Sequence, residues 1–245
     1  MNNIYKKAFT LAEVLITLAI IGVITAMTLP ALINKTNNAE IVTGVKKYQS
    51  LLNQAITKYE ADNGCIGNLS ACNAFSGASD HETAWNAIKP YFNITKDCGI
   101  SIGQGCFPKD VVYKWLNGTN KLVIDNQEDA KALLADGSCL LLWDATGNCD
   151  YPSSRSGKDP MAHLCGDFWI DINGFKGPNQ IGRDTFSWRI TNIGVYPTGH
   201  YDDYTADSNG NAACDPSNSN LSTAPYPGAG IGCTAKVIKE GAINY

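Results

Sequence analysis

The chain has 245 residues, of which 44% are hydrophobic and 17% charged, and its formal net charge is −4. This length allows one ordinary domain with an appendage, or two small domains. The mild acidity offers no basic face for a phosphate backbone, so nucleic-acid binding is not indicated. Low charge and 23 glycines are typical of a loop-rich, exported protein that contains β-structure, rather than of a helical cytosolic enzyme.

The N-terminus is a short polar segment followed by a long apolar run. Lys6 and Lys7 close the polar segment, and the apolar run extends from Phe9 to Ile33. It is long enough to cross ~30 Å of hydrocarbon, and the preceding lysines place the start of the chain inside and the rest outside. It is too long for a cleavable signal peptide, and no clear A-x-A site follows it. The pattern alone indicates a single-pass anchor.

The stretch KKAFTLAEVLITL is more specific than a plain anchor. It resembles the processing site of type IV prepilins and type II secretion pseudopilins, and the resemblance covers roughly residues 1–60. It implies that a prepilin peptidase cuts between Ala8 and Phe9 and methylates the new amine of Phe9. The family usually has Gly before the cut, where this chain has Ala8, which is also small.

Glu13 is a carboxylate inside the apolar run. A carboxylate in lipid costs several kcal/mol unless it is paired. After cleavage Phe9 would carry an amine that is cationic near neutral pH, one helical turn before Glu13. We expect Glu13 to pair with this amine, either in its own chain or in a neighbouring subunit, where pairing would set the register of a filament. The alternative is a carboxylate that snorkels to the lipid boundary.

Gly22 and Pro30 flank the stretch VITAMTL. Pro30 removes a backbone donor and clashes with the preceding turn, and glycine is a weak helix former. The resemblance to pilins implies an assembly role for both residues, because this segment could lose helicity when it packs in a filament. The alternative is a simple proline kink in a transmembrane helix.

An apolar stripe at three- and four-residue spacing continues beyond the anchor and predicts an amphipathic helix that ends near Asp62, before Asn63 and Gly64. We therefore divide the chain into a leader peptide (1–8), a membrane-spanning, filament-core helix (9–33), an amphipathic extension of the same helix (34–63) and a globular head (64–245). Region 199–245 of the head is expected to be mostly loop. The stripe comprises Ile41, Val45, Tyr48, Leu52, Ile56 and Tyr59.

Nine cysteines all follow the apolar run, without a C-x-x-C pair. With only three histidines, this pattern argues against zinc and favours disulfides formed in an oxidising compartment. Connectivity does not follow from sequence, but local pairs are plausible, and Cys139 would remain as a buried thiol. The candidate pairs are Cys65–Cys72, Cys98–Cys106, Cys149–Cys165 and Cys214–Cys233.

The head is predicted to be a mixture of short helices and strands. HETAWNAIKPYF is expected to be a short helix, and NQEDAKALLADG a short helix or helical turn. SCLLLWDA, FWIDI and TFSWRI are expected to be strands. DVVYKWL and KLVIDN could be strands or short buried segments. The fold class is therefore α+β and pilin-like: a long N-terminal α-helix, a small antiparallel sheet packed on its C-terminal half, and disulfide-rich loops.

The stretch DINGFKGPNQIGRDTF resembles a pattern in pseudopilin-like heads. Asp171, Asn173 and Asp184 carry oxygens of the kind that Ca²⁺ prefers, although the EF-hand spacing is absent. A hairpin turn explains the same residues, with Asn173 and Gly174 at positive φ and Asp184 capping backbone donors, and we favour the turn. No cofactor is required, and Ca²⁺ is the candidate ion.

No catalytic constellation is evident. His81, His163 and His200 lack convincing partners, and G-x-S-x-G, P-loop and H-E-x-x-H motifs are absent. The chain is predicted not to be an enzyme.

The resemblance implies a structural subunit of a type IV pilus or a type II secretion pseudopilus. It would enter the inner membrane as a single-pass precursor with a periplasmic head, then be cleaved, methylated and polymerised into a periplasmic or extracellular filament. Its partners would be other pilin or pseudopilin subunits, the prepilin peptidase, the inner-membrane assembly platform and membrane lipid. The alternative is a membrane-anchored exported binding or enzymatic domain that does not polymerise.

Overall fold

The computed structural model divides into two compact units. The first ends at Glu40, and the second begins at Ile41. One helix, α1 (Leu11–Asn63), contributes to both units. The first unit contains, in its described part, the N-terminal portion of α1, and the second unit is the head. The structure describes residues 10–75, 80–144, 147–149, 151–152, 163–199, 214–215 and 230–245.

Within the head, α1 contributes the predicted amphipathic stripe. All six residues of the stripe are buried, none more than 7% exposed. The Tyr48 hydroxyl donates to both carboxylate oxygens of Asp136, at 3.0 and 2.9 Å, and so ties the helix to a turn of the sheet. The helix ends at Asn63, and Gly64 follows with a φ of 70°, as expected of a glycine that stops a helix.

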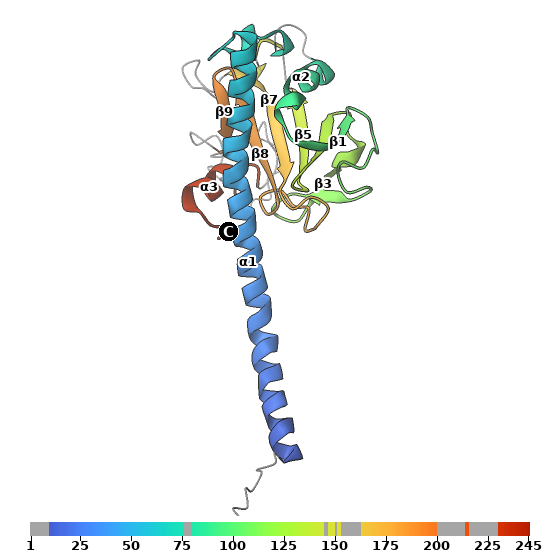
Figure 1. Cartoon of the computed structure of the whole chain (residues 1–245), viewed down its shortest axis with the longest axis vertical. Coiled ribbons are helices and arrows are strands. Elements are labelled where there is room, and N and C mark those ends of the chain that lie inside the picture. Colours follow the sequence, from blue (N-terminus) through green and yellow to red (C-terminus); the bar gives the residue numbers. More distant parts are fainter. Residues whose placement is uncertain are drawn as a thin grey trace, which may run out of the picture. The chain divides into compact units, whose positions relative to one another are not determined.

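The head is built on an antiparallel sheet, which confirms the predicted α+β class (Figure 1). A separate hairpin pairs β2 (Val112–Lys114) with β3 (Asn120–Val123), so DVVYKWL and KLVIDN each contain a strand. The predicted strands in SCLLLWDA, FWIDI and TFSWRI are confirmed as parts of β5, β7 and β8. The main sheet has the order β1 (Ile94–Gly99), β4 (Ala130–Leu134), β5 (Cys139–Asp144), β7 (His163–Asp171), β8 (Thr185–Thr191) and β9 (Gly194–Pro197), and β6 (Tyr151–Pro152) also pairs with β7.

The two faces of the sheet line two different cores. Side chains alternate between the two faces of the sheet along each strand. Leu140 and Phe168 therefore point to one face, and Leu141 and Trp169 point to the other. Leu140 and Phe168 belong to the main core, which also contains the buried stripe of α1. Leu141 belongs to a smaller core with Phe107, Tyr113 and Ile124, and Trp143 and Trp169 pack against it.

One predicted helix is wrong. Within NQEDAKALLADG, residues Ala130–Leu134 form β4, which pairs with β1 on one side and β5 on the other. Alanine, leucine and lysine favour helices, but two flanking strands and the burial of Ala130 and Ala132 override that local preference. Lys131 is also buried, and its Nζ donates to the carbonyls of Gln127 and Asp129.

The end of region 199–245, which was expected to be mostly loop, contains one helix. Cys233–Glu240 form this helix, α3. Val237 of this helix is fully buried, and the Thr234 hydroxyl accepts a hydrogen bond of 3.1 Å from the backbone N–H of Ser187 in β8. Burial of this side against β8 stabilises a helix that eight residues alone would not sustain. Residues 200–213 and 216–229 lie outside the described part.

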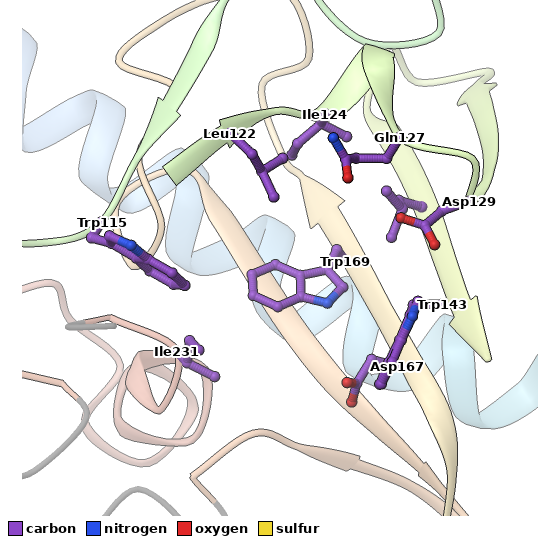
Figure 2. Close-up of a pocket in the computed structure, with 10 residues that line it drawn as sticks. Trp115, Leu122, Ile124, Gln127, Asp129, Trp143, Asp167, Trp169 and Ile231 are labelled. Atoms are coloured by element: carbon purple, nitrogen blue, oxygen red, sulfur yellow. The ribbon is translucent and has the colours of Figure 1, made fainter. Parts of the chain in front are cut away.

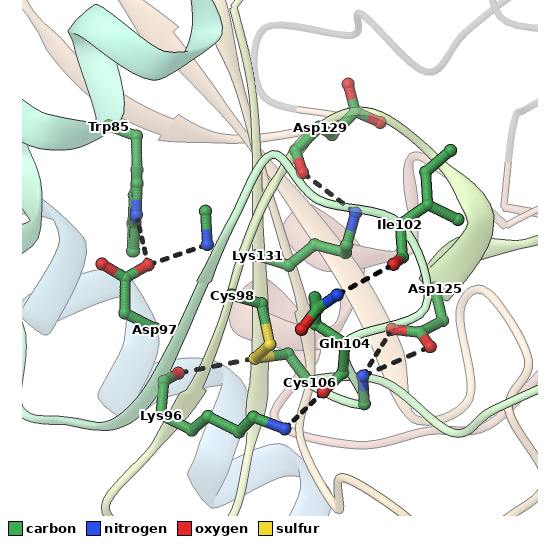
Figure 3. Close-up of a disulfide and its surroundings, with 12 residues drawn as sticks. Trp85, Lys96, Asp97, Cys98, Ile102, Gln104, Cys106, Asp125, Asp129 and Lys131 are labelled. Carbon is green, nitrogen blue, oxygen red and sulfur yellow. Dashed lines mark hydrogen bonds between the residues drawn. A yellow bond between two sulfur atoms is a disulfide. The ribbon is translucent and has the colours of Figure 1, made fainter.

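The other predicted short helix is confirmed. In HETAWNAIKPYF, residues His81–Ile88 form α2, and Asp80 caps it by accepting a hydrogen bond of 2.8 Å from the backbone N–H of Glu82. Trp85 of this helix donates to Asp97 of β1 at 2.8 Å, next to the disulfide drawn in Figure 3. This hydrogen bond fixes α2 against one edge of the sheet.

The four disulfides join the predicted pairs: Cys65–Cys72, Cys98–Cys106, Cys149–Cys165 and Cys214–Cys233. Cys139 is a buried free thiol, as expected. Figure 3 shows Cys98–Cys106 closing the loop after β1, where Lys96 Nζ also donates to the carbonyl of Gln104. Cross-links over short loops stabilise a head that has many turns, chiefly by restricting its unfolded state.

Candidate functional site

The predicted cut between Ala8 and Phe9 lies outside the described residues, which begin at Thr10. The first turn of α1 is described and holds Glu13. Both the backbone N–H and the hydroxyl of Thr10 donate to Glu13 Oε2 at 2.8 Å. In return, the N–H of Glu13 donates to the Thr10 hydroxyl at 3.2 Å.

This reciprocal arrangement is a capping box, in which the residue before the helix and the third helical residue satisfy each other's backbone donors. The prediction for Glu13 was a pairing with an amine or snorkelling to the lipid boundary, and neither involved Thr10. The sequence carries the signal, because TLAE fits the pattern [ST]-x-x-[DE] before an apolar run. In the uncleaved chain, Glu13 is therefore satisfied locally, and its pairing with the Phe9 amine stays a prediction.

The apolar part of α1 meets the length and composition of a membrane span. Its most apolar 18-residue window has a mean hydropathy of 2.3, and none of that window is buried. Large apolar side chains between Leu11 and Ile33 are 45–80% exposed. An exposed surface of this kind needs lipid or another apolar partner.

Gly22 and Pro30 lie inside α1, which continues through both of them. A side chain added at Gly22 would meet no atom within 4 Å, so its small size serves no packing within the described chain. Pro30 has no N–H to donate to the preceding turn, which leaves one helical hydrogen bond unmade. The predicted role of both residues in assembly stays a prediction.

The second predicted site lies at the turn between β7 and β8. Asp171 ends β7, and its carboxylate accepts hydrogen bonds from the Tyr113 hydroxyl at 2.5 Å and from the N–H of Gly174 at 3.0 Å. Asp184 precedes β8 and accepts hydrogen bonds of 2.7 Å from the backbone N–H groups of Asn179 and Gln180. Both carboxylates therefore organise the turn.

Asn173 completes the predicted set, and its amide donates to the carbonyl of Gly177 at 3.1 Å. Within the described residues, no group of three or more His, Cys, Asp or Glu side chains could hold a metal ion. The Ca²⁺ assignment stays a prediction. Tyr113 is a further polar residue of this site. No local pattern indicated it, because it comes from a distant hairpin.

Burial dominates the electrostatics of this turn. It raises the pKa of Asp171 to about 8, with a further contribution from the charge of Asp184. Burial likewise raises the pKa of Asp184 to about 6, against the opposing effect of the two backbone N–H groups. The neighbouring Cys139 thiol and Tyr113 hydroxyl also have raised pKa values, again chiefly from burial. Burial therefore shifts each of these groups toward its neutral form.

The pH dependence of head stability follows from these shifts. Asp171 binds its proton more tightly in the folded state than in the unfolded state, where an aspartate has a pKa of about 3.9. Its stabilising contribution is complete below about pH 4 and is lost as the pH rises through about 8. Thermal unfolding of the full chain in detergent should therefore show a midpoint that falls between pH 5 and 8.5.

Asp171→Asn is the matched variant for that measurement, because it is neutral at every pH, and it should flatten the decrease. A midpoint that is constant or rises over the same range would contradict the raised pKa. Millimolar Ca²⁺ in parallel scans tests the calcium prediction, since an ion bound to both carboxylates should raise the midpoint most at pH 8.5.

The histidines do not form a catalytic cluster in the described residues. His81 Nδ1 lies 3.8 Å from an oxygen of Asp129, and His163 is exposed at the start of β7. His200 lies outside the described part. No arrangement of a nucleophile with an adjacent base is apparent among these groups.

Comparison with known proteins gives one match. Residues 4–29 match the family model described as the prokaryotic N-terminal methylation motif. No curated protein and no solved structure matches the chain. The match covers both sides of the predicted cut and most of the apolar run.

An exposed apolar helix that carries this motif, followed by a disulfide-bonded α+β head, fits a membrane-anchored precursor. The methylation motif on that helix is the hallmark of the type IV pilin and pseudopilin family, so the resemblance found in KKAFTLAEVLITL is confirmed. Members of this family are typically structural subunits and not enzymes.

Proposed function

We propose that the chain is a structural pilin or pseudopilin subunit, which is cleaved between Ala8 and Phe9, methylated at Phe9 and polymerised into a type IV pilus or type II secretion pseudopilus. The observation that carries the proposal is the methylation motif at residues 4–29, on a helix whose apolar window is not buried by the described chain. Lipid covers such a surface in the precursor, and neighbouring copies of the helix cover it in a filament.

Cleavage changes the surroundings of Glu13. In the uncleaved chain the carboxylate accepts two hydrogen bonds from Thr10. Cutting before Phe9 places a cationic amine directly before Thr10. The amine of an adjacent subunit would then pair with Glu13 only at one axial offset, which fixes the register of assembly. The subunit works with the peptidase that exposes the amine, the inner-membrane platform and other copies of the helix.

Processing gives the first test. Co-expression with a prepilin peptidase should yield a mature protein that begins with N-methyl-Phe9, as measured by mass spectrometry of the intact chain and of its N-terminal peptide. Ala8→Gly should be cut at least as well, because it restores the usual family residue. Ala8→Leu, which places a bulky residue at the same site, should accumulate as precursor.

A retained Met1, or a cut beyond Ile33, would contradict the proposal and favour the alternative, a membrane-anchored head that does not polymerise. Sedimentation of the mature protein after removal of detergent separates the two functions further. A filament subunit should pellet as regular fibres visible by electron microscopy, whereas a plain anchored domain should form only amorphous aggregates or proteoliposomes.

A further inference from the structure

The head contains a pocket on the face of the sheet that carries the smaller core, with a volume of about 240 Å³ (Figure 2). Three of the five tryptophans of the chain line it: Trp115, Trp143 and Trp169. Figure 2 shows the ring of Trp169 between those of the other two. The remaining lining residues are Leu122, Ile124, Gln127, Asp129, Leu141, Asp167 and Ile231.

Strand register gathers these side chains. β5 and β7 pair so that Leu141 faces Trp169, and Trp143 faces Asp167. Alternation along the two strands directs all four residues to the same face, away from the main core. Trp115 follows β2 in the hairpin above this face, so two separate parts of the fold enclose the pocket.

The three indoles contrast with the other tryptophans of the chain. Trp85 and Trp188 are only 1% and 0% exposed, as core residues should be. Trp115, Trp143 and Trp169 are half-buried and line one shared cavity. A folding core gains most from complete burial of an indole, so three partly exposed rings around one pocket are typical of a binding site.

Each carboxylate of the pocket lies near a basic side chain of the head. Asp167 is 3% exposed, and Nη1 of Arg189 donates to both of its oxygens at 2.7 Å. Asp129 lies 3.8 Å from His81 Nδ1, and its charge also acts on the nearby Lys131. The pocket therefore combines aromatic faces and polar oxygens with little uncompensated negative charge.

We propose that this pocket binds one ring of a neutral carbohydrate. The faces of an indole are electron-rich and attract the weakly positive C–H groups on the flat side of a pyranose ring. Carboxylate and amide groups at the edge of such a stack accept and donate hydrogen bonds to sugar hydroxyls. The volume lies below the roughly 300–1,000 Å³ of pockets for drug-sized ligands, which suits a single ring of a longer glycan.

A quaternary ammonium group is the competing ligand, because it too binds aromatic faces. Such a cation gains most from uncompensated carboxylates, whereas the Arg189 guanidinium of the neighbouring strand β8 places a positive charge beside Asp167. The charge distribution therefore favours the neutral ligand. This proposal goes beyond the structural role proposed above and does not depend on polymerisation.

The test uses the full-length precursor in an oxyethylene detergent, since detergents with glucose or maltose headgroups would compete for the pocket. Binding is measured on an array of immobilised neutral oligosaccharides that contain glucose, galactose and their N-acetylamino derivatives. Protection of tryptophan fluorescence from acrylamide by the best soluble oligosaccharide then confirms the location, because Trp85 and Trp188 are already shielded.

Trp169→Ala and Trp115→Ala should each weaken the affinity at least about tenfold, and Trp169→Phe, which keeps an aromatic face, should lose less. Phe175→Ala is the matched control, because Phe175 is an aromatic residue of the head that is 53% exposed and lies outside the pocket. The Phe175→Ala variant should bind the oligosaccharide with the same affinity as the unchanged chain.

Three outcomes would overturn the proposal: no oligosaccharide binds the unchanged chain, both tryptophan-to-alanine variants bind as well as Phe175→Ala, or choline protects the tryptophans where sugars do not. Thermal unfolding of each variant identifies loss of fold, and Trp115→Ala provides an independent variant in the hairpin if Trp169→Ala unfolds. These readouts use the unassembled precursor, so failure of sugar binding and failure of filament formation are observed separately.

Discussion

Glu13→Gln is expected to abolish regular filament assembly of the processed subunit while the precursor still inserts in the membrane and its head stays folded. Glutamine at the third helical position can still complete a capping box with Thr10, so the substitution preserves the local hydrogen bonds and removes only the charge. Without that charge, the amine of Phe9 has no carboxylate to meet in an adjacent subunit. Electron microscopy and sedimentation of the mature protein measure the loss.

Thr10→Ala is the complementary variant. It removes the hydroxyl from the capping box, which costs about 0.5–2 kcal/mol of helix stability, but it keeps the carboxylate. Filaments should therefore still form. Normal assembly of Glu13→Gln, or equal failure of both variants, would show that Glu13 serves as a helix cap and that its charge does not set the register.

Gly174→Ala is expected to destabilise the head by on the order of 3 kcal/mol or more. Gly174 has a φ of 65°, where a side chain is strained, and an added Cβ would lie 2.0 Å from the carbonyl oxygen of Gly137. That contact is with backbone, so it cannot be relieved by a rotamer change. The turn would have to move, and with it the hydrogen bond from the N–H of Gly174 to buried Asp171.

Gly118→Ala separates the strain of a positive φ from the clash of the added Cβ with backbone. Gly118 also has a positive φ, of 84°, but an added Cβ there meets no atom within 4 Å. It should cost only the conformational strain, about 1 kcal/mol. The difference between the two variants in chemical denaturation of the full chain measures the backbone clash. Equal losses would show that the close approach of the two turns is not needed for stability.

The elements with strong local signals were predictable from the sequence. The stripe from Ile41 to Tyr59 repeats at helical spacing, and Asn63 and Gly64 stop it, so the helix and its end required no knowledge of the rest of the fold. The strands around Leu140, Phe168 and Trp188 are rich in large apolar and β-branched side chains. The disulfide pairs could be predicted because each joins one cysteine to the next cysteine along the chain.

Features that depend on contacts between distant segments could not be predicted from the sequence. β4 has a helix-forming composition and is a strand because β1 and β5 flank it. α3 is short, and its contacts with β8 stabilise it. The pocket was not foreseen, since its three tryptophans become neighbours only through strand register and a distant hairpin. Thr10 is the exception, because its capping signal is local and readable from the sequence TLAE.

The free thiol of Cys139 bears on how the head would mature if it is exported as proposed. Translocation from the N-terminal side would deliver Cys139 and Cys149 to the oxidising compartment before Cys165, so oxidation in order of arrival would join the wrong partners. In that case, early pairing of β4 with β5, which buries Cys139, would leave Cys149 free to join Cys165. Folding of this one hairpin would then decide whether the whole head acquires its native disulfides.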